Sequence, residues 1–212
     1  SLVATPQLLN GNNLDFIVYD YLAEITMSIM ARARAKDPSK GYAIDFVSSV
    51  MKLNLRQIAD QKVKILSNAG GVNPQACAEA IRALIKELNL DLKVAVVLGD
   101  DLLEDKDKFL DSGVQEMYSD EKFPEVDKIA SINAYLGAFP IAQALNDGAD
   151  IVITGRSVDS AVTLAACIHT YGWKEDDYDK LASGSLAGHI IECGTQSTGG
   201  NFTDWELVSK NL

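Results

Sequence analysis

The sequence has few of the residues that build disulfide frameworks, zinc sites or imidazole-based chemistry. Its 212 residues include three cysteines and two histidines. Cys77, Cys167 and Cys193 are widely spaced, and no CxxC pair occurs among them. An odd number of dispersed cysteines predicts neither a disulfide framework nor a structural zinc site, and it favours a reducing compartment. We interpret Cys77 and Cys167 as small core residues on apolar helix faces.

Long apolar runs and a surplus of positive charge are also missing. No apolar run approaches the length that crosses a bilayer, and residues 1–13 lack the basic start and apolar stretch of a secretory signal. The formal net charge is −11, whereas binding to nucleic acid requires a basic face. We therefore expect a cytoplasmic protein whose partners include neither a membrane nor nucleic acid.

What the sequence does contain is a regular alternation of strand and helix patterns. Its length and its 47% of hydrophobic residues suit one domain spanning residues 1–212. The alternation predicts an open, mainly parallel sheet with helices on both faces, an α/β fold of the Rossmann-like or flavodoxin-like three-layer type. The expected strands are 14–19, 63–67, 92–98, 129–132 and 150–154, and the expected helices are 21–35, 44–61, 74–88, 135–147, 158–171 and 181–193.

One segment, residues 102–128, stands apart as an acidic excursion. From Asp100 to Lys128 the chain carries eleven acidic residues and four lysines, and its apolar periodicity is poor. We expect a solvated excursion above the sheet. It is either a lid over a site or a plain surface insertion.

Glycines and polar residues follow each expected strand. In open α/β sheets, ligands bind outside the carboxyl ends of the strands. The sequence therefore predicts a small-molecule site at this edge. The strand exits are Asp20 with Glu24, Asn68–Pro74, Gly99–Asp101, Asn133–Gly137 and Gly155–Ser160.

Two of these exits indicate an anionic ligand. Gly70 and Gly71 free the backbone just before a helix, whose N-terminus can bind phosphate or carboxylate. The alternative is a plain turn with Asn73 as the helix cap. Arg156 can hold the same anion with a forked pair of hydrogen bonds, or it can pair internally with Asp159 to fix its own turn. The candidate ligand-binding residues are Asn68, Gly70, Gly71, Asn73, Asn133, Tyr135, Gly155, Arg156 and Asp159.

Four residues are candidates for proton transfer. Asp100 and Asp101 can act as a general base, bind a hard metal ion or cap a helix. His189 and Glu192 are three residues apart in an expected helix and share one face of it, beside Cys193. The alternative for this pair is a satisfied contact with no catalytic role. No ligand spacing indicates a metal site, and the sequence requires no cofactor.

Six segments, in this order, resemble the N-terminal domain of the acyclic terpene utilisation protein A family, and the resemblance covers essentially the whole chain. It implies an intracellular protein linked to the catabolism of acyclic isoprenoid acids as their CoA thioesters, but no reaction and no residue roles. The segments are Asp20–Glu24, Asn68–Pro74, Gly99–Leu103, Asn133–Ala138, Gly155–Asp159 and Leu186–Gly194.

The chain departs from this family at its two ends. Family members usually begin with a glycine-rich strand and loop that would precede Ser1, and they continue past Leu212. We therefore expect the chain to be a fragment. Its expected partner is the rest of its own chain or a second copy.

Three functions are compatible with these motifs. The first is an enzyme with a lyase, hydratase or isomerase step on a small anion, such as an acyl-CoA or a branched acid. Asp100, Asp101 or His189 would then move the proton. The second is a non-catalytic module that binds a ligand or partner in a larger assembly. The third is a metal-dependent hydrolase that uses the aspartate cluster.

Overall fold

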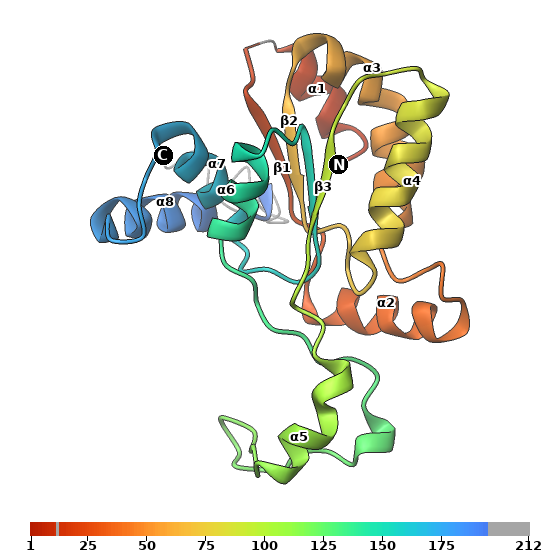
Figure 1. Ribbon diagram of the computed structural model, residues 1–212, viewed down its shortest axis with the longest axis vertical. Helices are drawn as coiled ribbons and strands as arrows, with labels where there is room; N and C mark the ends of the chain where they lie inside the picture. Colours follow the sequence, from red (N-terminus) through yellow and green to blue (C-terminus); the bar gives the residue numbers. More distant parts are fainter. Residues whose placement is uncertain (12, 195–212) are drawn as a thin grey trace, which may run out of the picture.

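A computed structural model describes residues 1–11 and 13–194 of the chain (Figure 1). The described residues form one sheet of four parallel strands, in the order β1-β2-β4-β3. The strands are β1 (Phe16–Tyr19), β2 (Lys64–Ser67), β3 (Val94–Val97) and β4 (Ile151–Thr154). In this register, Val152 of the central strand lies opposite both Leu66 and Ala95. The predicted α/β fold with a parallel sheet is confirmed.

Helices cover both faces of this sheet, which makes three layers. In Figure 1, α3 and α4 lie on one face and α6 and α7 on the other, while α2 lies crosswise at the carboxyl ends of the strands. No helix among the described residues is long and apolar enough to cross a membrane. The helices are α1 (Ala4–Asn10), α2 (Glu24–Lys36), η1 (Phe46–Met51), α3 (Lys52–Gln61), α4 (Pro74–Glu87), η2 (Leu103–Asp105), α5 (Lys106–Asp111), η3 (Val126–Lys128), α6 (Phe139–Asn146), α7 (Ala161–Tyr171) and α8 (Tyr178–Ile191).

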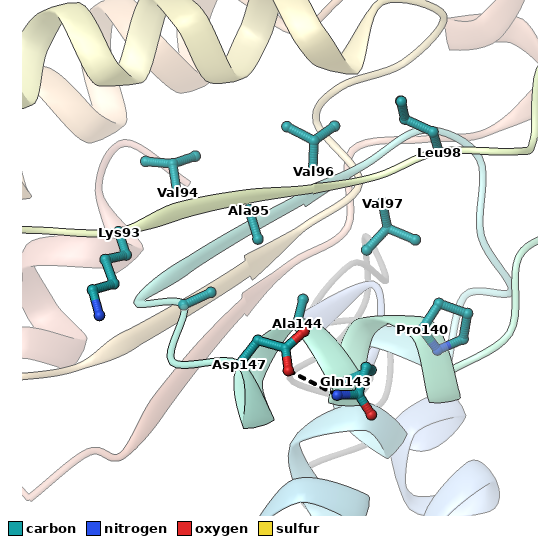
Figure 2. Close-up of a pocket in the computed structure, with 11 residues that line it drawn as sticks. Lys93, Val94, Ala95, Val96, Val97, Leu98, Pro140, Gln143, Ala144 and Asp147 are labelled. Carbon is teal, nitrogen blue, oxygen red and sulfur yellow. Dashed lines mark hydrogen bonds between the residues drawn. The ribbon is translucent and has the colours of Figure 1, made fainter.

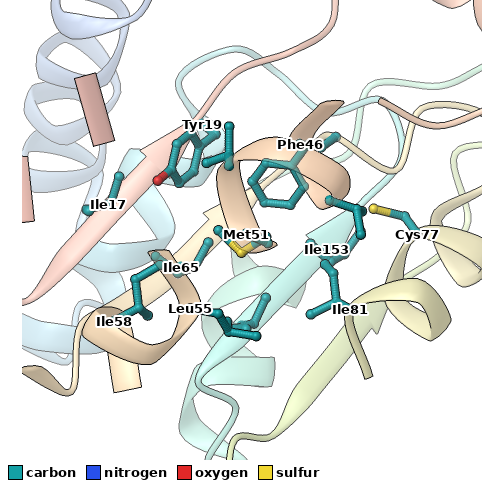
Figure 3. Close-up of a cluster of buried hydrophobic side chains, with 14 of the residues drawn as sticks. Ile17, Tyr19, Phe46, Met51, Leu55, Ile58, Ile65, Cys77, Ile81 and Ile153 are labelled. Carbon is teal, nitrogen blue, oxygen red and sulfur yellow. The ribbon is translucent and has the colours of Figure 1, made fainter. Parts of the chain in front are cut away.

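The two faces of the sheet bury two separate apolar clusters. Side chains alternate along each strand, so Ile151 and Ile153 contribute to the cluster under η1, α3 and α4, and Val152 to the cluster under α6 and α7. Figure 3 shows the first cluster, in which Phe46 and Leu55 are fully buried. Burial of each such side chain contributes roughly 1.5–3 kcal/mol. Burial on both faces explains why β4 is recognisable as an apolar run, whereas the edge strands β1 and β3 are only partly buried.

The expected strand at residues 129–132 is wrong. This segment does not reach the sheet, because it is the return limb of the acidic excursion and lies against the outgoing limb. The N–H of Leu102 donates to the carbonyl of Ile132 over 2.8 Å, and Asp101 forms an isolated antiparallel bridge with Asn133. The helix expected from residue 135 starts late, at Phe139, because Leu136 is extended and bridges Ser157.

We name residues 102–132 the acidic arm. It includes η2, α5 and η3 and extends away from the sheet beyond the carboxyl ends of the strands (Figure 1). An isolated antiparallel β-bridge between Gln115 and Lys122 holds the tip of the arm. The exposed side chains of Met117 and Tyr118 lie between these two residues. The arm therefore adds surface at the edge where a site was predicted.

A groove of about 560 Å³ follows the outer strand β3 on the side of α6. Figure 2 shows Ala95 and Val97 pointing toward α6, whereas Val94 and Val96 point the other way. Arg82 covers part of this strand edge, since its Nη2 donates to the carbonyl of Val94 over 2.8 Å. The groove runs along the strand rather than across its carboxyl end, so it is not the predicted site.

Phe46→Ala should remove the centre of the first cluster. Because the ring is fully buried, we expect the free energy of unfolding to fall by about 3–5 kcal/mol. The matched control is Leu53→Ala, which truncates a side chain that is 70% exposed and should change stability by about 0.5 kcal/mol or less. Urea denaturation followed by tryptophan fluorescence measures both. Equal losses in the two variants would contradict the assignment of this core.

Candidate functional site

The predicted site lies where the strand connections diverge. The exit of β2 leads to α4 on one face of the sheet, and the exit of the adjacent β4 leads to α7 on the other. Such a switch point is the usual ligand crevice of an open α/β sheet. Here the two exit loops contact each other directly, because the N–H of Gly70 donates to the carbonyl of Thr154 over 3.1 Å.

The glycines of the β2 exit allow this close packing. A Cβ on Gly70 would lie 2.4 Å from the carbonyl oxygen of Thr154, and one on Gly71 would lie 2.6 Å from the carbonyl oxygen of Gly41. Gly71 also has a φ of +57°, which L side chains rarely adopt. Close approach of two backbones therefore explains both glycines without a ligand.

The amides of the same loop are already engaged within the protein. The N–H of Gly71 donates to the main-chain carbonyl of Asn68 over 3.2 Å, and that of Val72 donates to the carbonyl of Gly41 over 2.9 Å. Asn73 caps α4, since its Oδ1 accepts from the N–H of Ala76 over 3.4 Å. The helix-cap alternative thus describes this loop, and anion binding by its amides stays a prediction.

Asn68 connects the exits of β1 and β2. It is fully buried, its Nδ2 donates to Asp20 over 2.6 Å, and its Oδ1 accepts from the N–H of Tyr21 over 2.7 Å. Burial raises the pKa of Asp20, and the hydrogen bond from Asn68 opposes that rise. Both polar ends of the Asn68 amide are therefore used to hold neighbouring loops.

Arg156 is the centre of a second network. Its side chain is only 4% exposed, and its Nη1 donates to Asp159 over 2.9 Å and to the carbonyl of Leu22 over 3.0 Å. The guanidinium carbon lies 4.1 Å from the centre of the Tyr135 ring. The hydroxyl of Tyr135 donates to Glu24 over 2.5 Å, and Glu24 is also 3.4 Å from Nη2 of Arg156. The internal Arg–Asp pair considered above is present.

Asp100 and Asp101 are neighbours with opposite environments. Asp100 is 2% exposed, and its Oδ2 accepts from the N–H of Arg156 over 2.7 Å and from Nδ2 of Asn133 over 2.9 Å. Burial raises the pKa of Asp100. Asp101 is partly exposed and pairs with Arg34 over 2.7 Å. Asp100 also packs on Gly155, where a Cβ would lie 2.2 Å from its Oδ2.

His189 is not brought into this network. It is exposed on α8, whereas Glu192 follows the end of that helix in an extended conformation, so the expected shared helix face is wrong. The thiol of Cys193 donates to Glu192 over 2.7 Å, and that carboxylate raises the pKa of Cys193 to about 11. A protonated thiol is a poor nucleophile.

Glu192 and Cys193 instead line a cavity of about 390 Å³ beside β1. Asp20 and Asp159 line the same cavity. Within residues 1–11 and 13–194, no group of three or more His, Cys, Asp or Glu side chains is arranged to hold a metal ion. The metal-dependent hydrolase therefore lacks a ligand set in this part of the chain.

Two further cavities flank α2 at the carboxyl edge. The first, of about 320 Å³, is lined by Arg34, by the start of α4 and by the exit of β3. The second, of about 440 Å³, lies between α2 and the acidic arm and is lined by Arg32 and Lys128. Sequence reasoning missed all three basic residues. One signal could have indicated the two arginines: Arg32 and Arg34 lie in the helix that directly follows the exit of the first strand.

Asp100→Asn tests whether ionisation of the buried carboxyl lowers the free energy of unfolding. The variant keeps an oxygen that accepts from Arg156 and Asn133 but removes the titratable group. Because the folded-state pKa of Asp100 is raised, the ionised carboxyl disfavours folding at neutral pH. That penalty vanishes as the pH falls through the folded pKa toward the ordinary value of about 3.9. The wild type should therefore lose stability relative to the variant as the pH rises from about 4 to 7.

Urea denaturation of both proteins across that pH range measures the difference. The control is Asp91→Asn at an exposed position, whose curve should follow the wild type. Parallel curves for Asp100→Asn and the wild type would refute the assigned environment of this carboxyl.

Arg156→Lys tests whether the fork of the guanidinium holds the exit loops together. Lysine keeps the charge, but a single ammonium cannot reach Leu22, Asp159 and Glu24 together or stack flat on Tyr135. We expect the free energy of unfolding to fall by about 2 kcal/mol, because the buried carbonyl of Leu22 and the partly buried Asp159 cannot both keep a partner. Arg56→Lys, at an exposed position of α3, should have almost no effect. Comparable stability of the two variants in thermal denaturation would speak against this role.

Comparison with known proteins agrees with the sequence motifs. The model of the family described as "Acyclic terpene utilisation family protein AtuA" matches residues 1–212. No curated protein and no solved structure matches the chain. Because the family match extends over the whole sequence given, the chain belongs to the acyclic terpene utilisation (AtuA) family.

Proposed function

We propose that this chain takes part in the catabolism of acyclic terpenes by binding a small anionic molecule at the carboxyl edge of its sheet. One observation carries the proposal. Helix α2 lies at that edge and contributes one arginine, Arg32 or Arg34, to the wall of each of two cavities. In a chain with a net charge of −11, two arginines at one edge are a local exception that favours anions at short range.

The two arginines differ in how much of their charge is available. Nη1 of Arg34 donates to the carbonyl of Val72 and to Asp101, so part of its guanidinium is committed. The side chain of Arg32 makes no ion pair or hydrogen bond with the residues that the structure describes. The cavity beside Arg32 therefore has the stronger preference for an anionic ligand.

A non-catalytic role is the second candidate, and the arrangement of the predicted acid–base groups favours it. Neither aspartate nor His189 lines the cavity beside Arg32, and His189 lies on α8, although Asp100 and Asp101 do line the cavity beside Arg34. An enzyme of the lyase, hydratase or isomerase type would need at least one of these groups to reach the ligand. A cytoplasmic location remains part of this proposal.

A thermal-shift screen tests the proposed function. The panel contains octanoate, octanoyl-CoA, free CoA, inorganic phosphate, Mg²⁺ and Zn²⁺. A ligand that binds only the folded chain stabilises it by about 2.7 kcal/mol at a hundredfold excess over its Kd. We therefore expect at least one organic anion to raise the midpoint by several degrees.

The other outcomes of the screen are equally specific. A rise with metal ions alone would replace the anion site with a metal site. No rise with any member of the panel would refute small-molecule binding at this edge. If an organic anion binds, Asp100→Asn and His189→Ala separate the two candidates, since loss of turnover with binding retained identifies an enzyme.

A further inference from the structure

The cavity between α2 and the acidic arm differs in composition from the cavity beside Arg34, whose lining includes Asp100 and Asp101. Two basic side chains, Arg32 and Lys128, line it together with hydroxyl-bearing and apolar residues, and its volume is about 440 Å³. That volume lies within the ~300–1,000 Å³ typical of small-molecule sites. We call it the arm groove. Of the residues with a described position, no acidic one belongs to its lining, although the arm itself is rich in acids.

Its basic residues come from opposite walls. Arg32 is exposed on α2, and Ser28 lies one turn earlier on the same helix face. Lys128 ends η3 on the arm, and its only ion pair among the described residues is with Glu125. Both members of that pair are 70% exposed, so it holds Lys128 weakly. A carboxylate between the walls can therefore receive charged hydrogen bonds from both sides.

Apart from Ser131, the rest of the lining is apolar. Phe123, Ile129 and Ile132 are half-buried in the wall formed by the arm. A small inorganic anion would leave these side chains in contact with water, whereas a hydrocarbon chain would bury them at roughly 25 cal/mol per Å². The groove thus fits a molecule with one charged end and one apolar end.

The negative charge around the groove should disfavour the binding of a polyanion more than that of a monoanion. Residues 100–128 carry eleven acidic side chains against four lysines, so a ligand with several phosphates meets repulsion that two basic residues do not offset. A monocarboxylate has a single charge, which Arg32 and Lys128 can neutralise. The free acid should therefore bind here in preference to its CoA thioester.

We propose that the arm groove binds a monocarboxylate with an apolar chain, with Arg32 and Lys128 holding the carboxylate and the arm covering the chain. This inference rests on the proposed function and specifies its ligand. The arm is placed for that role because both of its ends are fixed to the edge of the sheet. Leu102 pairs with Ile132, and Ala134 donates to the carbonyl of Asp100 over 2.8 Å.

Isothermal titration of the 212-residue chain with four probes tests the proposal. The probes are octanoate, acetate, octanol and octanoyl-CoA. Octanoate should bind more tightly than acetate, which lacks the chain, than octanol, which lacks the charge, and than octanoyl-CoA, which carries phosphates. Arg32→Gln should weaken octanoate binding about tenfold, and Lys128→Gln severalfold.

Charge-matched controls separate a local effect from a change in net charge. Arg56→Gln and Lys52→Gln remove the same charges from exposed positions on α3 and should leave the octanoate Kd within about twofold. Ile132→Ser should weaken octanoate binding but leave acetate binding unchanged. Thermal denaturation without ligand checks that each variant is folded. Arg32→Gln and Lys128→Gln should keep the wild-type midpoint, because both side chains are exposed.

Each contrary result has a separate meaning. Octanoate binding that is unaffected by Arg32→Gln and Lys128→Gln would overturn the arm groove but leave the proposed function standing. Tighter binding of octanoyl-CoA than of octanoate would overturn the ligand class. Failure of the wild type to bind any of the three anionic probes would overturn this inference, and it would overturn the proposed function as well if free CoA and phosphate gave no thermal shift.

Discussion

The carboxyl edge of the sheet depends on one buried cation. A guanidinium taken out of water destabilises a fold unless it finds hydrogen-bond and charge partners, and Arg156 has such partners in separate segments. Its contacts join the β4 exit to the β1 exit through Leu22 and to the segment after the arm through Tyr135. Asp100 adds the β3 exit by accepting from the N–H of the same residue. The four loops therefore form one connected network.

This network also decides where a ligand can bind. At the switch point between β2 and β4, the protein fills the crevice with its own groups, from the Gly70–Thr154 hydrogen bond to the buried side chain of Arg156. Open space lies instead on the two sides of α2. Arg156 thus lies at the centre of the predicted site, but it acts there by positioning other groups of the protein.

The strands and the layers could be predicted because they are local. Val152 and its neighbours form a short apolar run, and such runs identify strands buried on both faces. Residues 129–132 show the limit, since a short apolar segment has the same composition whether or not a neighbouring strand is free to pair with it. The groove residues Arg32 and Lys128 could not be found in this way. They are distant in sequence, and only the path of the arm brings them to one cavity.

The way the acidic arm joins the sheet has a consequence for how such a protein can diversify. Its two limbs leave and re-enter side by side, at the bridge between Asp101 and Asn133. An insertion whose ends already meet can change length at small cost, about 0.6 kcal/mol for each doubling. The wall of the arm groove can therefore be remodelled across a lineage while the buried network around Arg156 stays intact. Changes in ligand preference and changes in folding stability are separable in this architecture.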